Sequence, residues 1–402
     1  MQEWQSDVKV AGSNSDWRSI FSNSTENEAW SKPLASIVDK IKSGESLSID
    51  DGMVLYNHHN LNEVGKLSNF VKTSRFGTSA FFNSNVHINP TNICVLACRF
   101  CAFRRGRKAE DAYEYGPEVY ADELAKFAEH VDEVHTVGGL HPDWKIEDFE
   151  KMFSSAKDRF PHVMIKALTA VEIKHVAKMS GISVRETLSR LSQAGLDSLP
   201  GGGAEILDDT VRDIICKGKE SSAEYLEIHK TAHELGIPTN CTMLFGTVET
   251  LQQRLQHMID LRELARETNG FQCFVPYPFL PDDSRLPEAQ LATGSEIIRT
   301  IAVARLMIDT IPHIKAYRMN IGDNLAELAL QFGADDIDGT VQQELIMHLA
   351  GSSTPLDLDR NRLARLIEDA GCKPVIRNTT YTKFKEFVRK EIIPPRRLKM
   401  SS

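Results

Sequence analysis

Short β-rich runs alternate with amphipathic helical stretches about eight times from residue 84 onward, and this alternation limits the possible folds more than any other feature. Strand followed by helix, repeated, is typical of a parallel sheet covered by helices. A count of eight favours a closed (β/α)8 barrel of the TIM type over an open, doubly wound sheet, which remains the alternative. The predicted strands cover residues 85–89, 133–137, 163–168, 196–200, 239–245, 271–277, 314–320 and 333–338.

The rest of the 402-residue chain is predicted to flank this α/β barrel. Residues 1–30 are rich in Ser, Asn, Asp and Glu without periodicity, which predicts a mobile tail. Residues 31–75 carry helical apolar spacing and predict a helical extension, followed by the barrel over 76–355. Residues 356–402 hold the run RNRLARLIEDAG and a basic end, which predict a helical C-terminal tail.

Composition excludes several classes of function. A net charge of −9 and a pI near 5.8 argue against nucleic acid as a partner. No apolar run reaches the ~18 residues that span a bilayer, and no secretory signal is recognisable, so we expect no membrane partner. The seven cysteines form no disulfide framework, which favours the reducing cytoplasm.

Three of these cysteines, Cys94, Cys98 and Cys101, follow the first predicted strand with the spacing C-x-x-x-C-x-x-C. Thiolates are the usual ligands of iron–sulfur clusters, and three of them would leave one iron of a cubane open to a small molecule. A zinc site and three inert core cysteines are the alternatives. The other cysteines, Cys216, Cys241, Cys273 and Cys372, are scattered, and the first three are most simply core residues.

Polar and glycine-rich runs follow the later strands, where the carboxyl ends of a β/α barrel form the active site. Gly138 and Gly139 follow the second strand, and Glu172 follows the third. The fourth strand leads into three consecutive glycines, which allow close backbone approach, and then Glu205. Arg212 is placed to bind a carboxylate, or simply to form a salt bridge with Glu205.

The cysteine spacing, with Phe100 before the last cysteine, resembles the signature of radical S-adenosylmethionine (SAM) enzymes. The resemblance implies a 4Fe-4S cluster whose open iron binds SAM, with a glycine turn that contacts the methionine amino group. It assigns Cys94, Cys98 and Cys101 to the metal. The residues assigned to cofactor binding are Phe100, Gly138, Gly139, Glu172, Glu205 and Arg212.

Residues 50–385 resemble the aminofutalosine synthase family of menaquinone biosynthesis, on runs such as EVHTVGGLHPD, IKALTAVEI, GLDSLPGGGAEIL and FGADDIDGT. Dehypoxanthine futalosine cyclases and deazaflavin-precursor synthases share part of this pattern and remain alternatives. The resemblance implies a transferase that adds the 5′-deoxyadenosyl radical to 3-[(1-carboxyvinyl)oxy]benzoate with loss of carbon dioxide. It also implies an electron donor such as flavodoxin or ferredoxin.

An aryl enol ether with two carboxylates requires cations and hydrogen-bond donors in the site. The residues predicted to act on the substrate are His87, Arg104 and Arg318, with Arg105, Lys166 and Arg212 as further candidates for the carboxylates. His87 is predicted to face either the barrel lumen or the helices, because its neighbours Val86 and Ile88 must face the other side. Arg318 lies at a position where the resemblance to the synthase family leads us to expect an apolar residue.

Overall fold

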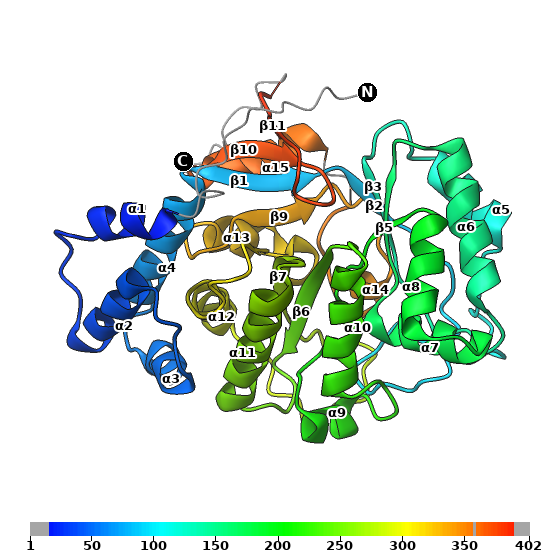
Figure 1. Ribbon diagram of the computed structural model, residues 1–402, viewed down its shortest axis with the longest axis horizontal. Helices are drawn as coiled ribbons and strands as arrows, with labels where there is room; N and C mark the ends of the chain where they lie inside the picture. Colours follow the sequence, from blue (N-terminus) through cyan, green and yellow to red (C-terminus); the bar gives the residue numbers. More distant parts are fainter. Residues whose placement is uncertain (1–15, 357–358, 390–402) are drawn as a thin grey trace, which may run out of the picture.

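A computed structural model describes residues 16–356 and 359–389, and within these ranges eight parallel strands, β2 to β9, form a closed barrel (Figure 1). The predicted α/β barrel is therefore confirmed. The strands are β2 (Asn85–His87), β3 (Glu133–Thr136), β4 (Met164–Ala167), β5 (Leu196–Ser198), β6 (Thr239–Phe245), β7 (Phe271–Pro278), β8 (His313–Ile314) and β9 (Asp336–Gly339).

The barrel is closed by short contacts between the sheets. β2 to β5 and β6 to β8 form two sheets in chain order. Single parallel bridges, Leu199 with Thr239 and Lys315 with Asp336, join β5 to β6 and β8 to β9. After β9, the Gln342 amide donates to the Asn85 carbonyl at 3.2 Å, which completes the ring beside β2.

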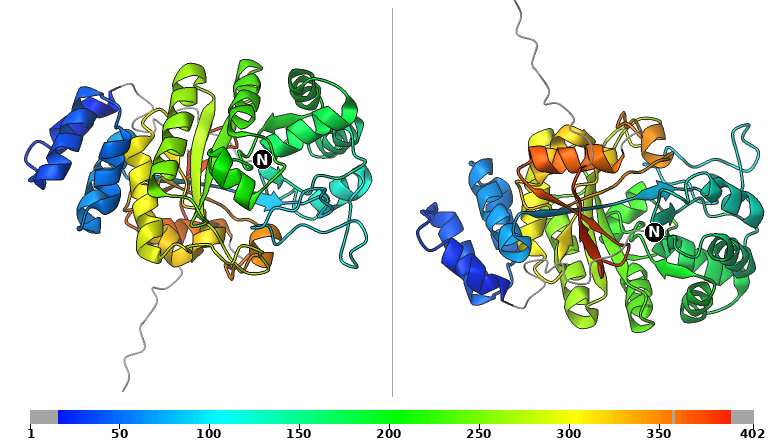
Figure 2. Two further views of the ribbon diagram at one scale, coloured as in Figure 1. Left: turned by 90° about the horizontal axis from the view of Figure 1, so that it is seen from below. Right: turned by 90° about the horizontal axis from the view of Figure 1, so that it is seen from above.

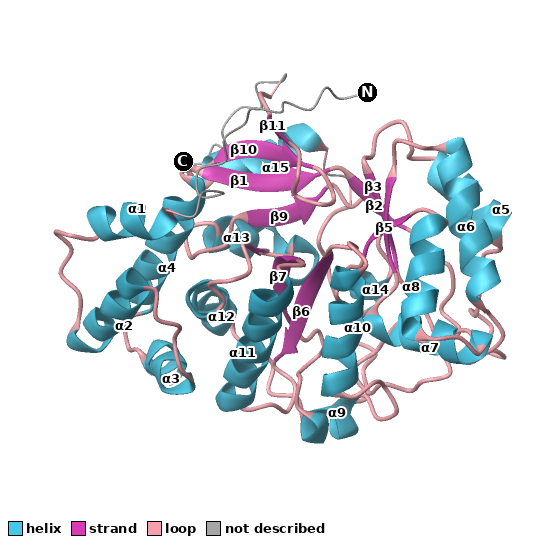
Figure 3. Cartoon of the chain, viewed as in Figure 1, coloured by secondary structure: helices cyan, strands magenta, loops and turns pink. Residues whose placement is uncertain are grey.

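Helices flank the barrel strands, as Figure 3 shows, and all seven residues of β6 are buried. Several helices begin at a hydrogen-bonding cap: Ser221 and Thr250 form capping boxes at the starts of α10 and α11. These helices are α5 (Pro117–Ala125), α6 (Ile146–Arg159), α7 (Ala170–Ser180), α8 (Val184–Gln193), α9 (Asp209–Ile215), α10 (Ser222–Glu234), α11 (Leu251–Thr268), α12 (Gly294–Met307), α13 (Arg318–Ala329) and α14 (Ile346–Leu349). No helix in the described ranges is long and apolar enough to cross a membrane.

The N-terminal helices pack on one side of the barrel, against α12 (Figure 2). They are α1 (Trp17–Ser24), α2 (Lys32–Ser43), α3 (Ile49–Asn57) and α4 (Leu61–Phe76). The prediction of a mobile tail over 1–30 is wrong for residues 16–30, since Trp17 and Phe21 of α1 are buried in the core. Residues 1–15 lie outside the described ranges.

The C-terminal segment corrects a second prediction. α15 (Arg360–Asp369) is the predicted helix, but β10 (Lys373–Arg377) and β11 (Phe384–Glu386) follow it instead of a helical tail. β10 pairs in parallel with β1 (Ser79–Asn83), a strand absent from the sequence predictions, and β1 also pairs with β9. Residues 390–402, with most of the predicted basic end, lie outside the described ranges.

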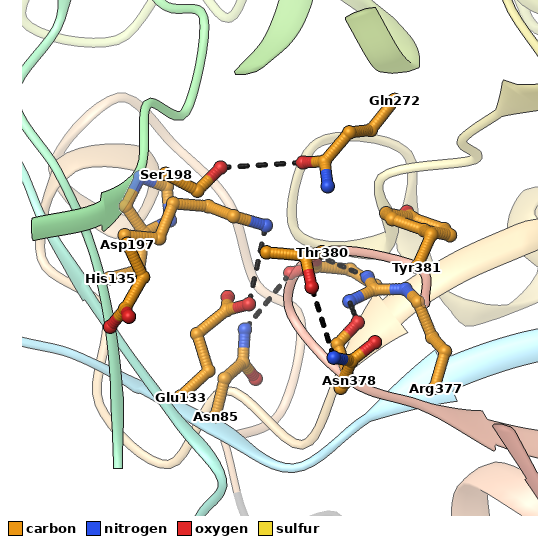
Figure 4. Close-up of polar contacts among 12 residues, drawn as sticks. Asn85, Glu133, His135, Asp197, Ser198, Gln272, Arg377, Asn378, Thr380 and Tyr381 are labelled. Carbon is orange, nitrogen blue, oxygen red and sulfur yellow. Dashed lines mark hydrogen bonds and ion pairs between the residues drawn. The ribbon is translucent and has the colours of Figure 1, made fainter. Parts of the chain in front are cut away.

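The end of β10 and the chain that follows it fill the amino-terminal end of the barrel. Arg377, Asn378 and Thr379 are buried there. Figure 4 shows Arg377, Asn378 and Tyr381 close to Asn85 and Glu133, which stand at the starts of β2 and β3. Because this end is closed, access to the lumen is from the carboxyl ends of the strands.

The predicted strand 314–320 is too long. β8 ends at Ile314, and α13 begins at Arg318. The apolar and polar residues of this run alternate over too short a length to separate a strand end from a helix start. Arg318 consequently lies on a helix.

Candidate active site

A cavity of about 290 Å³ lies at the carboxyl ends of the strands and continues into the lumen. It brings together most of the residues predicted from the sequence, although they come from four separate segments of the chain. Those that line it are His87, Cys94, Cys98, Phe100, Cys101, Gly138, Glu172 and Glu205. Gly139, Arg104, Arg212 and Arg318 do not line it.

The three cysteines lie on the loop after β2 as free thiols facing this cavity. The loop is fixed by backbone hydrogen bonds, from the Cys94 amide to the Arg105 carbonyl at 3.1 Å and from the Val95 amide to the Leu140 carbonyl at 3.0 Å. Burial raises the pKa of the Cys98 thiol to about 12, against the opposing charge of Lys219. A free thiol here is therefore protonated, and metal binding must displace its proton.

The donor set fits an iron–sulfur cluster. Three sulfurs face one space, and burial raises the pKa of Cys101 although the amides of Arg104 and Phe103 donate to its sulfur. Such hydrogen bonds to cluster sulfurs are a usual means of tuning the potential. No described group of three His, Cys, Asp or Glu residues converges on a single metal ion, which is the arrangement that a zinc site requires.

The two glycines after β3 have different surroundings. The Gly138 amide faces the cavity and donates to Glu172 Oε1 at 2.9 Å. Gly139 instead packs under the cysteine loop: its amide donates to the Thr91 carbonyl at 2.8 Å, and an added Cβ would lie 2.2 Å from the Ile93 carbonyl oxygen. Gly139 thus permits the close approach of two loops, and Gly138 is the one within reach of a ligand.

Glu172 joins the glycine turn to the start of α7. Its other oxygen, Oε2, accepts from the Thr169 amide at 2.7 Å and from the Thr169 hydroxyl at 2.6 Å, which completes a capping box. Burial raises the pKa of Glu172 to about 7, against these hydrogen bonds. The carboxyl group is therefore poised to ionise beside a cationic ligand.

The glycine run after β5 is packed tightly against β6. Gly201 has φ of +82°, and an added Cβ would lie 2.2 Å from the Asn240 carbonyl oxygen. The Gly201 carbonyl accepts from the hydroxyls of Tyr225 at 2.6 Å and Thr242 at 2.9 Å. Gly202 and Gly203 line the cavity, so their backbone is the part of the run that a ligand can approach.

Glu205 and Arg212 do not pair with each other, and the predicted alternative of a salt bridge between them is wrong. Glu205 Oε1 accepts from Lys219 Nζ at 2.5 Å, and this ammonium also lies 5.5 Å from the centre of the Phe100 ring. Arg212 donates to the carbonyl of Gly203 at 3.2 Å and forms an ion pair with Glu220 at 3.2 Å. Arg212 therefore supports the glycine run from behind.

Lys219, which the sequence interpretation missed, lines the cavity beside Cys98 and Glu205. Nothing in its local pattern, KGKE, distinguishes it from a surface lysine. Only the return of the chain after α9 brings it to the cysteine loop.

The lumen below the cysteines is polar. Strand register places His87, His135 and Lys166 at one level on β2, β3 and β4. His135 Nδ1 lies 3.2 Å from His87 Nε2, and burial lowers the pKa of both imidazoles, so both are neutral. His87 faces the lumen, one of the two orientations predicted for it.

The predicted arginines bind elsewhere. Arg104 Nε donates to the Leu96 carbonyl at 3.0 Å. Arg105 binds Asp111 at 2.5 Å and nearby backbone carbonyls. Arg318 is fully buried at the start of α13, where it binds Asp323 at 3.0 Å and the Pro355 carbonyl at 2.9 Å. The geometry therefore gives Arg104 and Arg318 no contact with a ligand in the cavity.

Known proteins share the sequence pattern and the fold of this chain. Residues 88–261 match the radical SAM superfamily, and residues 268–391 match the CofH/MqnC C-terminal region. Two solved structures share the fold: methylornithine synthase (PylB), with a TM-score of 0.67 and 19% identity over 84% of this chain and 97% of that one, and the maturase HydG of Carboxydothermus hydrogenoformans, with 0.68 and 16% over 91% and 83%.

Curated relatives are more similar in sequence. The chain is 41% identical to the aminodeoxyfutalosine synthase of Thermus thermophilus, over 89% of this chain and 98% of the relative. It is 34% identical to the cyclic dehypoxanthine futalosine synthase of Streptomyces coelicolor, over 87% and 88%. It is 36% identical to the 5-amino-6-(D-ribitylamino)uracil–L-tyrosine 4-hydroxyphenyl transferase of Methanoculleus marisnigri, over 87% and 97%. The chain therefore belongs to the radical SAM superfamily of enzymes and, within it, to the family of aminodeoxyfutalosine synthases and their close relatives.

Proposed function

We propose that this protein joins the adenosyl group of SAM to 3-[(1-carboxyvinyl)oxy]benzoate, releasing methionine and carbon dioxide as bicarbonate, to form 6-amino-6-deoxyfutalosine for menaquinone biosynthesis. The observation that carries the proposal is a single cavity with three thiols near its mouth and buried ammonium groups in its depth. An addition reaction needs both substrates in one chamber, and the second substrate is a dianion. The 41% identity to aminodeoxyfutalosine synthases, against 34% to the cyclic dehypoxanthine enzyme, supports this member of the family.

The cysteines would hold the cluster, with Cys94, Cys98 and Cys101 each ligating one iron. When bound, the cluster supplies one electron that cleaves SAM into methionine and a 5′-deoxyadenosyl radical. Glu172, held by the Gly138 amide, is positioned to accept from the methionine ammonium group. The backbone of Gly202 and Gly203 offers close approach to the rest of the nucleoside.

The apolar lining of the cavity would protect the reaction from water. Leu140, Val171, Leu244, Val275 and Phe279 contribute apolar surface to the cavity. Such surface excludes water, which would otherwise compete for reactive intermediates. Neutral His87 and His135 keep a proton between Nε2 and Nδ1 without adding charge to the lumen.

The proposal includes two features outside the site itself. A low-potential donor such as flavodoxin or ferredoxin would supply the electron. The cytoplasm is the proposed compartment, because all seven cysteines are free thiols, as is usual for proteins in reducing conditions.

The test is an anaerobic assay of the reconstituted protein with dithionite, SAM and 3-[(1-carboxyvinyl)oxy]benzoate, read by mass spectrometry. A product that contains both the adenosyl and the benzoate parts, less carbon dioxide, is expected. Release of 5′-deoxyadenosine and methionine alone would reject this substrate and favour the cyclase reaction on dehypoxanthine futalosine. The Cys98→Ala protein, carried through the same assay, should cleave no SAM.

A further inference from the structure

Two lysines of the barrel strands project into the deep part of the cavity, Lys166 on β4 and Lys315 just after β8. Both are nearly inaccessible to solvent, at 2% and 3% exposure. Transfer of an ammonium group from water into a protein interior costs several kcal/mol unless partners compensate for it. What compensates each lysine therefore indicates whether its charge serves the fold or a ligand.

Lys315 is compensated by the fold. Its Nζ donates to Asp338 Oδ1 at 2.5 Å and lies 3.7 Å from Asp336. Although burial opposes it, the two carboxylates raise the pKa of Lys315. Asp336 in turn binds Arg377 at 2.6 Å and the Tyr381 hydroxyl at 2.8 Å. Lys315 thus belongs to a network that closes the amino-terminal end of the barrel.

Within the described ranges, Lys166 forms an ion pair with Glu133 alone. Its Nζ lies 3.2 Å from Glu133 Oε2, an ion pair without hydrogen-bond geometry, and Oε2 accepts no hydrogen bond from any described residue. Figure 4 shows Glu133 reaching up into the lumen beside His135. Although burial opposes ionisation, the cations Lys166 and Arg377 hold the pKa of Glu133 at about 2, so the carboxylate stays charged.

The ammonium group of Lys166 retains donors for a ligand. Lysine has three N–H donors, and no described residue accepts a well-formed hydrogen bond from those of Lys166. Nζ borders the cavity, as do His87 and His135 at the same level of the barrel. A buried cation that faces an open chamber, next to two imidazoles, is suited to a carboxylate.

The level of Lys166 also indicates which carboxylate it would bind. Lys166 is in register with His87, whereas Cys94 lies seven residues beyond His87 on the loop at the mouth. The vinyl carbon must face the adenosyl group near the cysteines. The ring carboxylate, at the opposite end of the substrate, then extends into the lumen.

We propose that Lys166 binds the ring carboxylate of the aryl enol ether and thereby determines which aryl group the enzyme accepts. This inference rests on the proposed function for the identity of the ligand. Glu133 is the positioning residue that holds the ammonium group when the cavity is free of substrate. Its charge also explains why a lysine is tolerated in the lumen.

The test uses the reconstituted enzyme with SAM but without reductant, so that ligands bind and do not react. Calorimetric titration compares 3-[(1-carboxyvinyl)oxy]benzoate with 2-phenoxyacrylate, which lacks only the ring carboxylate. Lys166→Met should weaken binding of the first ligand about 10- to 100-fold, the usual range for losing a charge-assisted hydrogen bond, and leave the second unchanged. Lys166→Arg should recover most of the lost affinity.

Lys157→Met is the matched control, because Lys157 also forms an ion pair, with Asp197 at 2.7 Å, but outside the cavity. It should bind both ligands as the unmodified protein does. An equal loss for both ligands in Lys166→Met, or no loss for either, would overturn the inference. If Lys166→Met does not fold, the same comparison is made with Lys166→Gln and Lys166→Arg. Failure of the unmodified enzyme to bind either ligand would instead reject the proposed function.

Discussion

The backbone amide of Gly138 donates to Glu172 Oε1 across 2.9 Å, which joins the turn after β3 to the first turn of α7. The same carboxyl group caps α7 through Thr169. One side chain therefore fixes the relative positions of two strand ends that border the cavity. A ligand that binds there meets a preformed pocket wall rather than two independent loops.

This relationship predicts how SAM binding depends on pH. Burial raises the pKa of Glu172 to about 7, so its carboxyl group is mostly neutral at pH 6 and ionised at pH 8. Because the methionine ammonium group is better bound by a carboxylate, SAM affinity of the reconstituted enzyme should rise as pH increases through 7. Glu172→Gln should bind SAM about 10-fold more weakly at pH 8 and show no such rise.

Glu224→Gln is the control for this prediction, since Glu224 occupies the same capping position at the start of α10, away from the cavity. It should keep both the affinity and the pH profile of the unmodified enzyme. A pH profile of Glu172→Gln that matched the unmodified enzyme would show that another group controls SAM binding.

Cys98 and Cys216 are a matched pair for testing the cluster. Both are buried thiols whose pKa values burial raises, to about 12 and about 11, but only Cys98 lines the cavity. Cys98→Ala should retain little iron and acid-labile sulfide after reconstitution, whereas Cys216→Ala should retain nearly all of it. Iron, sulfide and zinc analysis measures the outcome. Full iron in Cys98→Ala, or zinc without sulfide in the unmodified protein, would contradict the assignment.

Gly139 predicts a steric effect on the cysteine loop. A methyl group there would lie 2.2 Å from the Ile93 carbonyl oxygen, and backbone cannot move aside as a flexible side chain can. Gly139→Ala should destabilise the protein by about 1–3 kcal/mol and reduce iron uptake. Gly116→Ala, where the added methyl group meets nothing within 4 Å, should change neither quantity measurably. Urea unfolding and iron analysis of both variants provide the comparison.

Arg377 is predicted to be essential for the closed end of the barrel. Its Nε binds Asp336 Oδ2 at 2.6 Å, and both side chains are fully buried. Removing one partner of a buried ion pair leaves an uncompensated charge, so Arg377→Met should reduce the free energy of unfolding by about 3–5 kcal/mol. Lys373 lies on β10 like Arg377, and Lys373→Met, which breaks an exposed pair with Glu386 of β11, should cost less than about 1 kcal/mol. Similar losses in the two variants would refute this account.

The eightfold alternation of strand and helix was sufficient to predict the barrel, because periodicity is a local property of the chain. β6 matches its predicted range, 239–245, and the other predicted barrel strands differ mainly at their ends, except that the predicted strand 314–320 shares only Ile314 with β8. β1 and β10 escaped prediction for the opposite reason. Their pairing joins Phe82 to Ile376, nearly 300 residues apart, and the local sequence of neither segment indicates which strand it pairs with.

The residues of the site likewise fall into those that local spacing predicts and those that it does not. Cys94, Cys98 and Cys101 occupy a few consecutive turns of one loop, so their spacing in the sequence already brings them together. Lys219 and Arg318 carry no such local signal. Whether a basic side chain enters the cavity, as Lys219 does, or binds backbone elsewhere, as Arg318 does, depends on how distant segments pack.

By itself, the sequence determined the alternation of barrel strands with helices, the position of the thiols after the first barrel strand and the family resemblance. Only the tertiary structure decided that the ammonium group of Lys166 has no well-formed hydrogen bond to a described residue, whereas that of Lys315 donates to Asp338. The physical reason is that periodicity and spacing act along the chain, whereas the compensation of a buried charge depends on which groups surround it in space.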